Sequence, residues 1–324
     1  MSATPQSTGK ARALPALVAE GLTRRFGDRV AVDQVSFEVS HGEVFCFLGP
    51  NGAGKSTTAR MLTGFMRPTS GRALIAGLDV STQTSAAHRL IGVVPEEANV
   101  YADLTVLQNV MLMAELHGIS RAQGLPRTDE LLHDFDMQER KHQKGRELSK
   151  GLRQRLMLCM ALVSDPQVLF LDEPTTGLDV ASTHMIREII QRMNWERGLT
   201  VFITTYNMDE ADQLCHRVAI IDKGKLAAID TPLALRGRVS SLRSVEVRFT
   251  QSGVKPQDVL TQPFGKVIIS ANGFQVFDPE PGRVAQEIAT RASALKLSIE
   301  SLNTLSPTLE EVFISITGGP HGSP

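Results

Sequence analysis

Nine consecutive residues combine glycines with a lysine and hydroxyl side chains, and they fit the phosphate-binding sequence GxxxxGK[ST]. The segment consists of Gly49, Pro50, Asn51, Gly52, Ala53, Gly54, Lys55, Ser56 and Thr57. Glycines let successive backbone N–H groups point at phosphate oxygens, and a following helix adds the positive end of its dipole. Lys55 can reach the β- and γ-phosphates, and the Ser56 hydroxyl can ligate Mg²⁺. Because an apolar run precedes the segment and a helical pattern follows it, we predict a nucleotide-binding loop.

Two consecutive carboxylates, Asp172 and Glu173, follow a second apolar run at 168–171. Ligands of open parallel sheets bind at the carboxyl ends of the strands, which is where this pair would lie. We expect Asp172 to hold Mg²⁺, commonly through water. Glu173, one residue closer to the γ-phosphate, can polarise an attacking water. By itself an acidic pair after a strand is equally typical of a helix's first turn, but with the loop it predicts hydrolysis of a nucleotide.

The segments around these residues have the pattern of an α/β protein. Continuous apolar runs are typical of parallel strands that are covered on both faces. We expect such strands at 44–48, 168–171 and 200–204. We expect helices near 55–63, 105–118, 149–164 and 180–196, as βαβ units require. Residues 17–39 alternate in short pieces and indicate an antiparallel sheet beside the central strands.

A smaller domain is expected after Thr231 and Pro232, where the pattern changes. The expected strands are 245–249, 266–270, 274–277 and 295–301, with helices at 256–261, at 283–291 and after Pro307. The order β-α-β-β-α-β is that of a small split βαβ domain. The predicted division is a disordered leader at 1–17, a nucleotide-binding domain at 18–232, a small α+β domain at 242–317 and a tail at 318–324.

The composition of the 324 residues excludes several classes of protein. Hydrophobic residues make up 42% and charged residues 21%, which rules out a disordered chain, a collagen-like repeat and a coiled coil. With 34 basic and 35 acidic residues there is no global basic field, so we expect no nucleic-acid partner. Cys46, Cys159 and Cys215 lie far apart and are expected to be reduced thiols of a cytosolic protein. No apolar run approaches the roughly 18 to 20 residues that span a bilayer, so a membrane role would need a partner.

A third motif lies between the loop and the acidic pair and completes a family resemblance. In the stretch LSKGLRQR at 148–155, Ser149 is a good helix N-cap, and its hydroxyl with the Gly151 backbone makes a second anion-binding helix start. At 23 residues before Asp172, the stretch resembles the signature sequence of ABC transporter nucleotide-binding subunits, usually LSGGQ. Lys150 and Leu152 depart from the commonest form and resemble a variant of drug- and ion-exporting members. The resemblance covers about 18–232.

The resemblance implies a fold and a set of nucleotide contacts. The fold would be that of an α/β P-loop NTPase with a mixed-sheet core, an antiparallel β flank and a helical subdomain, followed by a small α+β domain. In this family two subunits sandwich two ATP molecules, so Ser149 and Gly151 would act on the nucleotide of the other subunit. Phe26, 23 residues before Gly49, is similar to the aromatic residue that stacks on adenine. The segment 174–179 resembles the loop that crosses the dimer interface.

Two positions differ from the residues that the family normally has. Glu96 stands where a glutamine contacts Mg²⁺ and the attacking water. A carboxylate keeps a hard oxygen for Mg²⁺, but it adds negative charge near the γ-phosphate. Tyr206 stands where a histidine touches the γ-phosphate, and it keeps one O–H donor without becoming a cation at neutral pH. With Lys55 and Glu173 intact, we expect slow but measurable hydrolysis of Mg-ATP.

The resemblance further implies a transport role. The chain would be the ATPase of an export system that acts through a separate transmembrane permease, as a homodimer or with another ATP-binding subunit. It would be cytoplasmic, held at the inner face of the membrane by that permease, whose coupling helix would dock on 96–120. The motif PTLEEVF at 307–313 resembles the accessory domain of antibiotic, drug or sodium exporter ATPases, and we expect that domain to brace the dimer. The alternative, which Glu96 and Tyr206 favour, is an ATP-gated regulatory clamp without a transport role.

Overall fold

The computed structural model describes residues 14–97, 100–261 and 265–318. Its chain divides into two units, 1–226 and 227–324, and the division falls inside strand β10. Most of the leader expected at 1–17, and nearly all of the tail expected at 318–324, lie outside the described residues. Among the described helices, none has both the length and the apolar character that crossing a membrane requires.

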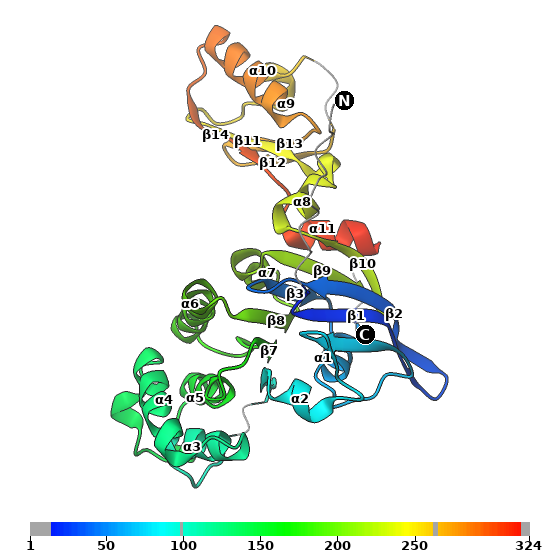
Figure 1. The fold of residues 1–324 in the computed structure, drawn as a ribbon. Helices are drawn as coiled ribbons and strands as arrows, with labels where there is room; N and C mark the ends of the chain where they lie inside the picture. The colour runs from blue at the N-terminus through cyan, green and yellow to red at the C-terminus, as the bar shows by residue number, and fades with distance from the viewer. Residues whose placement is uncertain (1–13, 98–99, 262–264, 319–324) are drawn as a thin grey trace, which may run out of the picture. The chain divides into compact units, whose positions relative to one another are not determined.

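The first unit is built on a sheet with the strand order β10-β9-β3-β8-β7-β6 (Figure 1). The strands are β3 (Val44–Leu48), β6 (Ile91–Val94), β7 (Val168–Asp172), β8 (Thr200–Thr205), β9 (Arg217–Asp222) and β10 (Lys225–Asp230). Pairing is parallel between β6 and β7, β7 and β8, β8 and β3, and β3 and β9. The three predicted buried strands are confirmed as β3, β7 and β8. Their carboxyl ends lie side by side, because Leu48 pairs with Thr205 and Asp172 pairs with Thr204.

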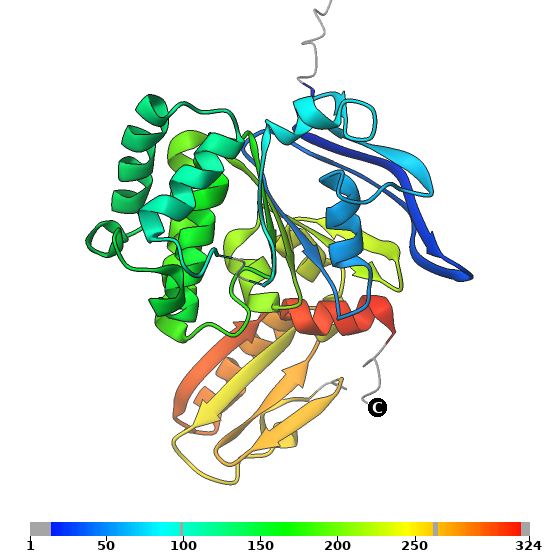
Figure 2. The same cartoon turned by 90° about the horizontal axis from the view of Figure 1, so that it is seen from below.

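A second, antiparallel sheet has the order β2-β1-β4-β5, as residues 17–39 predicted for its first two strands. Its strands are β1 (Leu17–Phe26), β2 (Arg29–Val39), β4 (Ser70–Ile75) and β5 (Leu78–Asp79). Helix α1 (Lys55–Leu62) lies between the two sheets and contacts strands of both (Figure 2). Stacked and tilted phenylalanine rings fill the core above the central strands: Phe37, Phe45, Phe47, Phe170 and Phe202. Strand β3, which directly precedes the phosphate-binding loop, is packed in this core, so the start of the loop is held in position.

Helices cover the rest of the first unit. They are α2 (Thr84–His88), α3 (Val106–Leu116), α4 (Arg121–Asp134), α5 (Lys150–Leu162), α6 (Val180–Arg197) and α7 (Met208–Leu214), with single 3₁₀ turns at Gln138–Arg140 and Gly145–Glu147. The sequence did not predict α4, because Gly124 and Pro126 count against a helix interior. Packing overrides that preference: a Cβ at Gly124 would lie 3.2 Å from the Ala114 Cβ, so glycine lets α4 approach α3 closely.

The second unit has the predicted order of a split βαβ domain, in an antiparallel sheet β12-β13-β11-β14. Its elements are α8 (Pro232–Gly237), a 3₁₀ turn at Ser240–Leu242, β11 (Ser244–Phe249), α9 (Pro256–Val259), β12 (Val267–Ser270), β13 (Gly273–Phe277), α10 (Pro281–Ala294), β14 (Ile299–Leu305) and α11 (Leu309–Thr317). The core packs α10 against the sheet through Val247, Phe274 and Ile288. The last strand begins four residues later than predicted, because α10 runs to Ala294 and a turn with positive φ at Lys296 follows it.

Candidate functional site

The glycine-rich segment forms a loop between β3 and α1 that only glycines can follow at two of its positions. Gly52 and Gly54 have φ values of 80° and 108°, in the left-handed region that side chains disfavour. A Cβ on Gly54 would also lie 2.8 Å from the Ala31 carbonyl oxygen of β2. The loop curls around Lys55, which begins α1 and is buried. The loop therefore has the curled backbone on which the predicted phosphate contacts depend.

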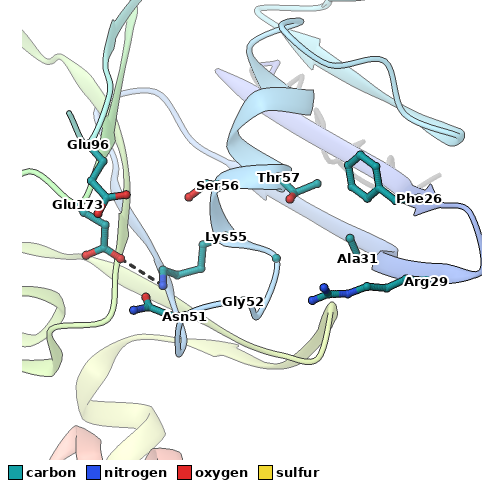
Figure 3. Close-up of a pocket in the computed structure, with 11 residues that line it drawn as sticks. Phe26, Arg29, Ala31, Asn51, Gly52, Lys55, Ser56, Thr57, Glu96 and Glu173 are labelled. Carbon is teal, nitrogen blue, oxygen red and sulfur yellow. Dashed lines mark ion pairs between the residues drawn. The ribbon is translucent and has the colours of Figure 1, made fainter. Parts of the chain in front are cut away.

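A cavity of 340 Å³ opens beside this loop. It is lined by Phe26, Arg29, Ala31, Asn51, Gly52, Gly54, Lys55, Ser56, Thr57, Glu96 and Glu173. Phe26 and Arg29 lie at one end of the cavity and the two glutamates at the other, with the loop between them (Figure 3). An aromatic ring at one end and a lysine and hydroxyls at the other suit a base and its phosphates. Of the other predicted loop residues, Gly49 and Ala53 are buried, and the Pro50 carbonyl accepts a hydrogen bond from Lys55.

Lys55 is the cation of the site. Its Nζ atom donates to the carbonyl oxygens of Gly49, at 2.8 Å, and Pro50, at 3.3 Å. It also forms an ion pair with Glu173, with 3.2 Å between Nζ and Oε1 and only 5% of either side chain exposed (Figure 3). Opposite charges attract more strongly when they are shielded from water, so this pair links the loop to the end of β7.

Hard oxygen donors for a cation meet next to this pair. The Ser56 hydroxyl donates to Asp172 Oδ1 at 3.2 Å, and the Thr204 hydroxyl donates to the same carboxylate oxygen. Mg²⁺ is usually bound by one or two protein oxygens with water and substrate phosphates, so Ser56 and Asp172 fit it. Glu96 is exposed and lines the same cavity. No group of three or more His, Cys, Asp or Glu side chains able to hold a metal occurs in the described residues.

Glu173 is held in a strained position immediately after β7. Its φ is +50°, although it is not a glycine, and its N–H donates to the Thr204 carbonyl at 2.9 Å. The carboxylate accepts hydrogen bonds of 3.3 Å from the Tyr206 N–H and the Thr176 hydroxyl. Burial raises the pKa of Glu173, and the Lys55 ammonium only partly opposes this. A carboxylate with a raised pKa and a fixed orientation is suited to accept a proton.

A second buried carboxylate, Glu210 on α7, lies behind the site and was not predicted. It accepts hydrogen bonds from the hydroxyls of Thr175, at 2.9 Å, and Thr205. Thr175 lies in the loop that follows Glu173, and Thr205 ends β8 directly before Tyr206, so Glu210 links the segments that carry Glu173 and Tyr206. Burial raises the pKa of Glu210. No motif marks it, and its partners lie at least five residues away in sequence.

Arg29 is a further cavity residue that the motifs did not indicate. It pairs with Phe26 across the two-residue turn Gly27–Asp28 that joins β1 and β2. This FGDR hairpin is readable in the sequence and could have placed Arg29 beside Phe26. The Phe26 ring is 46% exposed, and the Arg24 guanidinium carbon lies 4.7 Å from its centroid.

Besides Gly49, Pro50, Ala53 and Asp172, which lie next to the cavity lining, three predicted site residues do not line the cavity: Ser149, Gly151 and Tyr206. Ser149 is exposed at the start of α5, where its hydroxyl accepts a hydrogen bond from the Leu152 N–H at 3.3 Å. Gly151 is buried, and a Cβ there would lie 2.3 Å from the Ser182 hydroxyl oxygen. Tyr206 reaches Glu173 through its main chain, and its residue surface is 47% exposed. The structure therefore does not bring Ser149 and Gly151 to the cavity of their own chain.

Comparison with known proteins gives consistent similarities. The family described as ABC transporter matches residues 32–176. The chain is 35% identical over 301 residues to the Nod factor export ATP-binding protein I of Mesorhizobium japonicum, covering 92% of this chain and 85% of that protein. It is 34% identical over 311 residues to the daunorubicin/doxorubicin resistance ATP-binding protein DrrA of Streptomyces peucetius (94% and 93% covered). It is 32% identical over 315 residues to the linearmycin resistance ATP-binding protein LnrL of Bacillus subtilis (93% and 98% covered).

Solved structures resemble the chain over about two thirds of its length. The structure of an ATP-binding subunit of an ABC transporter matches with a TM-score of 0.63 and 28% identity, covering 69% of this chain and 92% of that one. CbiO1 of Clostridium perfringens, part of the ABC transporter complex cbiONQ, matches with a TM-score of 0.63 and 26% identity, covering 70% and 94%. The predicted P-loop NTPase fold is confirmed.

The buried position of Glu210 predicts how stability depends on pH. A carboxyl whose folded pKa lies above its ordinary 4.5 binds its proton more tightly in the folded state, so the free energy of unfolding falls as the pH rises through that interval. Glu210→Gln removes this contribution to the pH dependence of stability and keeps a side-chain oxygen that accepts the hydrogen bond from the Thr175 hydroxyl. Urea unfolding of both proteins between pH 5 and pH 8, followed by circular dichroism, should show the variant gaining stability relative to the wild type with rising pH. A difference that is the same at every pH would contradict this.

Proposed function

Because the chain belongs to the ABC transporter family of ATP-binding subunits, as its motifs predicted, we propose that it hydrolyses ATP at the cavity between Lys55 and Glu173. Subunits of this family are ATPases coupled to transport, and they dimerise and work with a transmembrane permease. The observation that carries the proposal is the convergence of three groups at one end of the cavity. These groups are the Lys55 ammonium, the Ser56–Asp172 oxygen pair and the Glu173 carboxylate.

The cavity suits ATP along its whole length. Phe26 offers an exposed ring on which adenine can stack, and the glycine-rich loop, whose N–H groups would bind the phosphates, lies between Phe26 and Glu173. The Lys55 ammonium has three donors, enough to keep a loop carbonyl and still bind β- and γ-phosphate oxygens. Mg²⁺, held by Ser56 and Asp172 with Glu96 nearby, would neutralise charge on these phosphates. Thr204 keeps the Asp172 carboxylate oriented.

Glu173 is the general base of the proposed reaction. Its carboxylate accepts a proton from water as the water oxygen attacks the γ-phosphorus. The bond from that phosphorus to the β–γ bridging oxygen breaks, and ADP leaves. The raised pKa of Glu173 brings its basicity closer to what proton transfer needs near neutral pH. The bonds from the Tyr206 N–H and the Thr176 hydroxyl fix the direction of the carboxylate.

The complete site requires a second ATP-binding subunit. Ser149 lies exposed at the start of α5, outside the cavity of its own chain, next to the N–H groups of the first turn of the helix. We propose that this helix start binds the γ-phosphate of the nucleotide held by the other subunit. Two ATP molecules then close the dimer, and hydrolysis reopens it. Either a second copy of this chain or a related subunit meets this requirement.

The permease is proposed to dock in an apolar groove of 300 Å³ on the first unit. The groove is lined in part by Phe65, Val93, Tyr101, Met113, Met157 and Met160. Tyr101 and Met113 come from the stretch 96–120 that the sequence predicted, and methionines adapt readily to an inserted helix. Glu96 lines the nucleotide cavity and also a neighbouring cavity of 790 Å³. This neighbouring cavity shares Phe65 and Val93 with the groove, so Glu96 can relay motion between the nucleotide cavity and the groove. Through this contact the subunit would sit at the inner face of the membrane.

Export is the direction that the relatives favour. The names of three similar proteins refer to Nod factor export, linearmycin resistance and daunorubicin/doxorubicin resistance. Resistance to a compound is consistent with its removal from the cell. We therefore propose that the permease partner of this chain exports a compound and that the chain supplies the energy.

Replacing the proposed base should abolish turnover without abolishing binding. Glu173→Gln keeps the shape of the side chain but cannot accept a proton, so steady-state phosphate release should fall roughly 100- to 10,000-fold. ATP binding, measured with a fluorescent analogue, should persist. Glu188→Gln changes an exposed glutamate on α6 and should leave turnover unchanged. Unaltered turnover in Glu173→Gln would refute the assignment of the base.

Tyr206→His tests whether the departure from the family residue slows the reaction. A histidine can donate to the γ-phosphate and carry a positive charge, and one such transition-state donor is worth on the order of 100- to 1000-fold in rate. We expect kcat to rise in the variant. An unchanged kcat would show that the tyrosine serves equally well, and an undetectable rate in both proteins would favour the ATP-gated clamp.

The groove predicts a separable effect on the permease complex. Phe65→Glu places a charge among apolar lining residues and should prevent co-purification, in mild detergent, with the transmembrane product of a neighbouring reading frame. Trp195→Glu alters another exposed aromatic side chain, on α6, and should leave the complex intact. Equal recovery of the permease with both variants would place the docking surface elsewhere.

A further inference from the structure

The first residue of α5, Lys150, reaches across to the loop that follows the proposed base. Its Nζ atom donates to the carbonyl oxygen of Thr176 at 2.7 Å, a contact between residues 26 positions apart. In the family's usual signature this position is a glycine, which has no side chain to make such a bond. The contact is therefore a consequence of the lysine in this chain.

The backbone on the other side of the contact is shaped to receive the ammonium group. Gly177 has a φ of 68°, and a Cβ there would lie 2.5 Å from Lys150 Nζ. One residue further into α5, Gly151 packs equally closely against Ser182. The backbone N–H and the hydroxyl of Ser182 each donate to the Asp179 carboxylate at 2.8 Å. The first turn of α5 thus contacts the segment 176–182 near both of its ends.

Thr176 connects this contact to the catalytic carboxylate. The carbonyl of Thr176 accepts from Lys150, while its hydroxyl donates to Glu173 Oε2 at 3.3 Å. The Thr176 N–H also donates to the Glu173 carbonyl at 3.2 Å. A shift of Lys150 therefore moves the residue that orients the Glu173 carboxylate.

We propose that Lys150 is a positioning residue that couples the two nucleotide sites of the dimer. The inference rests on the proposed function, in which Ser149 binds the nucleotide of the other subunit and Glu173 acts on the nucleotide of its own chain. Phosphate bound at Ser149 would fix the adjacent Lys150 in its contact with the Thr176 carbonyl, and Thr176 would then hold the Glu173 carboxylate toward the attacking water. Each site then hydrolyses its ATP efficiently only when a nucleotide is also bound at the other site.

The test compares Lys150→Met, which removes the ammonium but keeps the length of the side chain, with Lys150→Arg, which restores a donor. In Lys150→Met, kcat should fall about 10- to 100-fold, as misplacement of a reacting group does. The KM for ATP should stay unchanged, and the Hill coefficient for ATP should fall toward one. Lys150→Arg should recover most of the lost kcat and most of the lost Hill coefficient. Lys225→Met changes another exposed lysine, which pairs with Asp33, and should behave as wild type.

A readout that does not depend on turnover is amide hydrogen exchange in the loop. The N–H groups of Thr176 and Leu178 donate to backbone carbonyls within the loop. With ATP bound, their exchange should be faster in Lys150→Met than in wild type or Lys225→Met. Thr176→Val removes the hydroxyl that donates to Glu173, which is the next contact between Lys150 and the carboxylate. The double variant of Lys150→Met and Thr176→Val should therefore have a kcat only slightly below that of the more impaired single variant.

Unchanged kcat and Hill coefficient in Lys150→Met would overturn the proposal, as would a raised KM with unchanged kcat, which would make Lys150 a nucleotide-binding residue. Glu173→Gln, measured in the same assay, distinguishes failure of the coupling proposal from failure of the proposed function. If Glu173→Gln loses turnover while Lys150→Met keeps it, the coupling role is wrong and the proposed function stands. If Glu173→Gln keeps turnover, the proposed function fails first.

Discussion

The chemistry of this protein depends on the parallel pairing of β3, β7 and β8. In that register Leu48 lies beside Thr205, and Asp172 lies beside Thr204, so three strands end at one edge of the sheet. The loop that begins after Leu48 then delivers Lys55 to Glu173, although the two residues are far apart in sequence. A slip of one residue in any of these strands would turn the functional side chains to the opposite face. Such a slip would be costly, because it would break the stacking of Phe37, Phe45 and Phe202 on one face of the sheet.

One cation is surrounded by several acids at this edge, and the balance among them sets how the site behaves. Lys55 pairs directly with Glu173, and Asp172 and Glu210 lie close enough to act on the Glu173 charge. Burial disfavours the charged form of both glutamates and raises the pKa of each. Binding of a metal nucleotide would bring both positive charge and phosphate oxygens into this cluster. Small shifts of the surrounding loops would then have large electrostatic effects, since little water screens them.

The elements that the sequence predicted well are those with a local signature. The phosphate loop needs its own glycines and lysine, and the carboxylates of Asp172 and Glu173 follow a continuous apolar strand. The contacts that orient these groups could not be predicted, because they join residues distant in sequence: Thr204 to Asp172, Thr175 to Glu210 and Lys150 to Thr176. Helix α4 was missed for a related reason, since its glycine is favourable only against the facing helix. Strand β14 begins later than predicted, because the sequence pattern did not show where α10 ends and the turn after it begins.

Single-turnover hydrolysis of ATP by the purified protein with Mg²⁺ tests the central claim most directly, with Lys55→Ala as the control. The arrangement of Lys55, Ser56, Asp172 and Glu173 predicts phosphate release by the wild-type protein that disappears in the variant. Tight ATP binding without phosphate release would contradict an ATPase role for this chain on its own, and so would release that persists in Lys55→Ala.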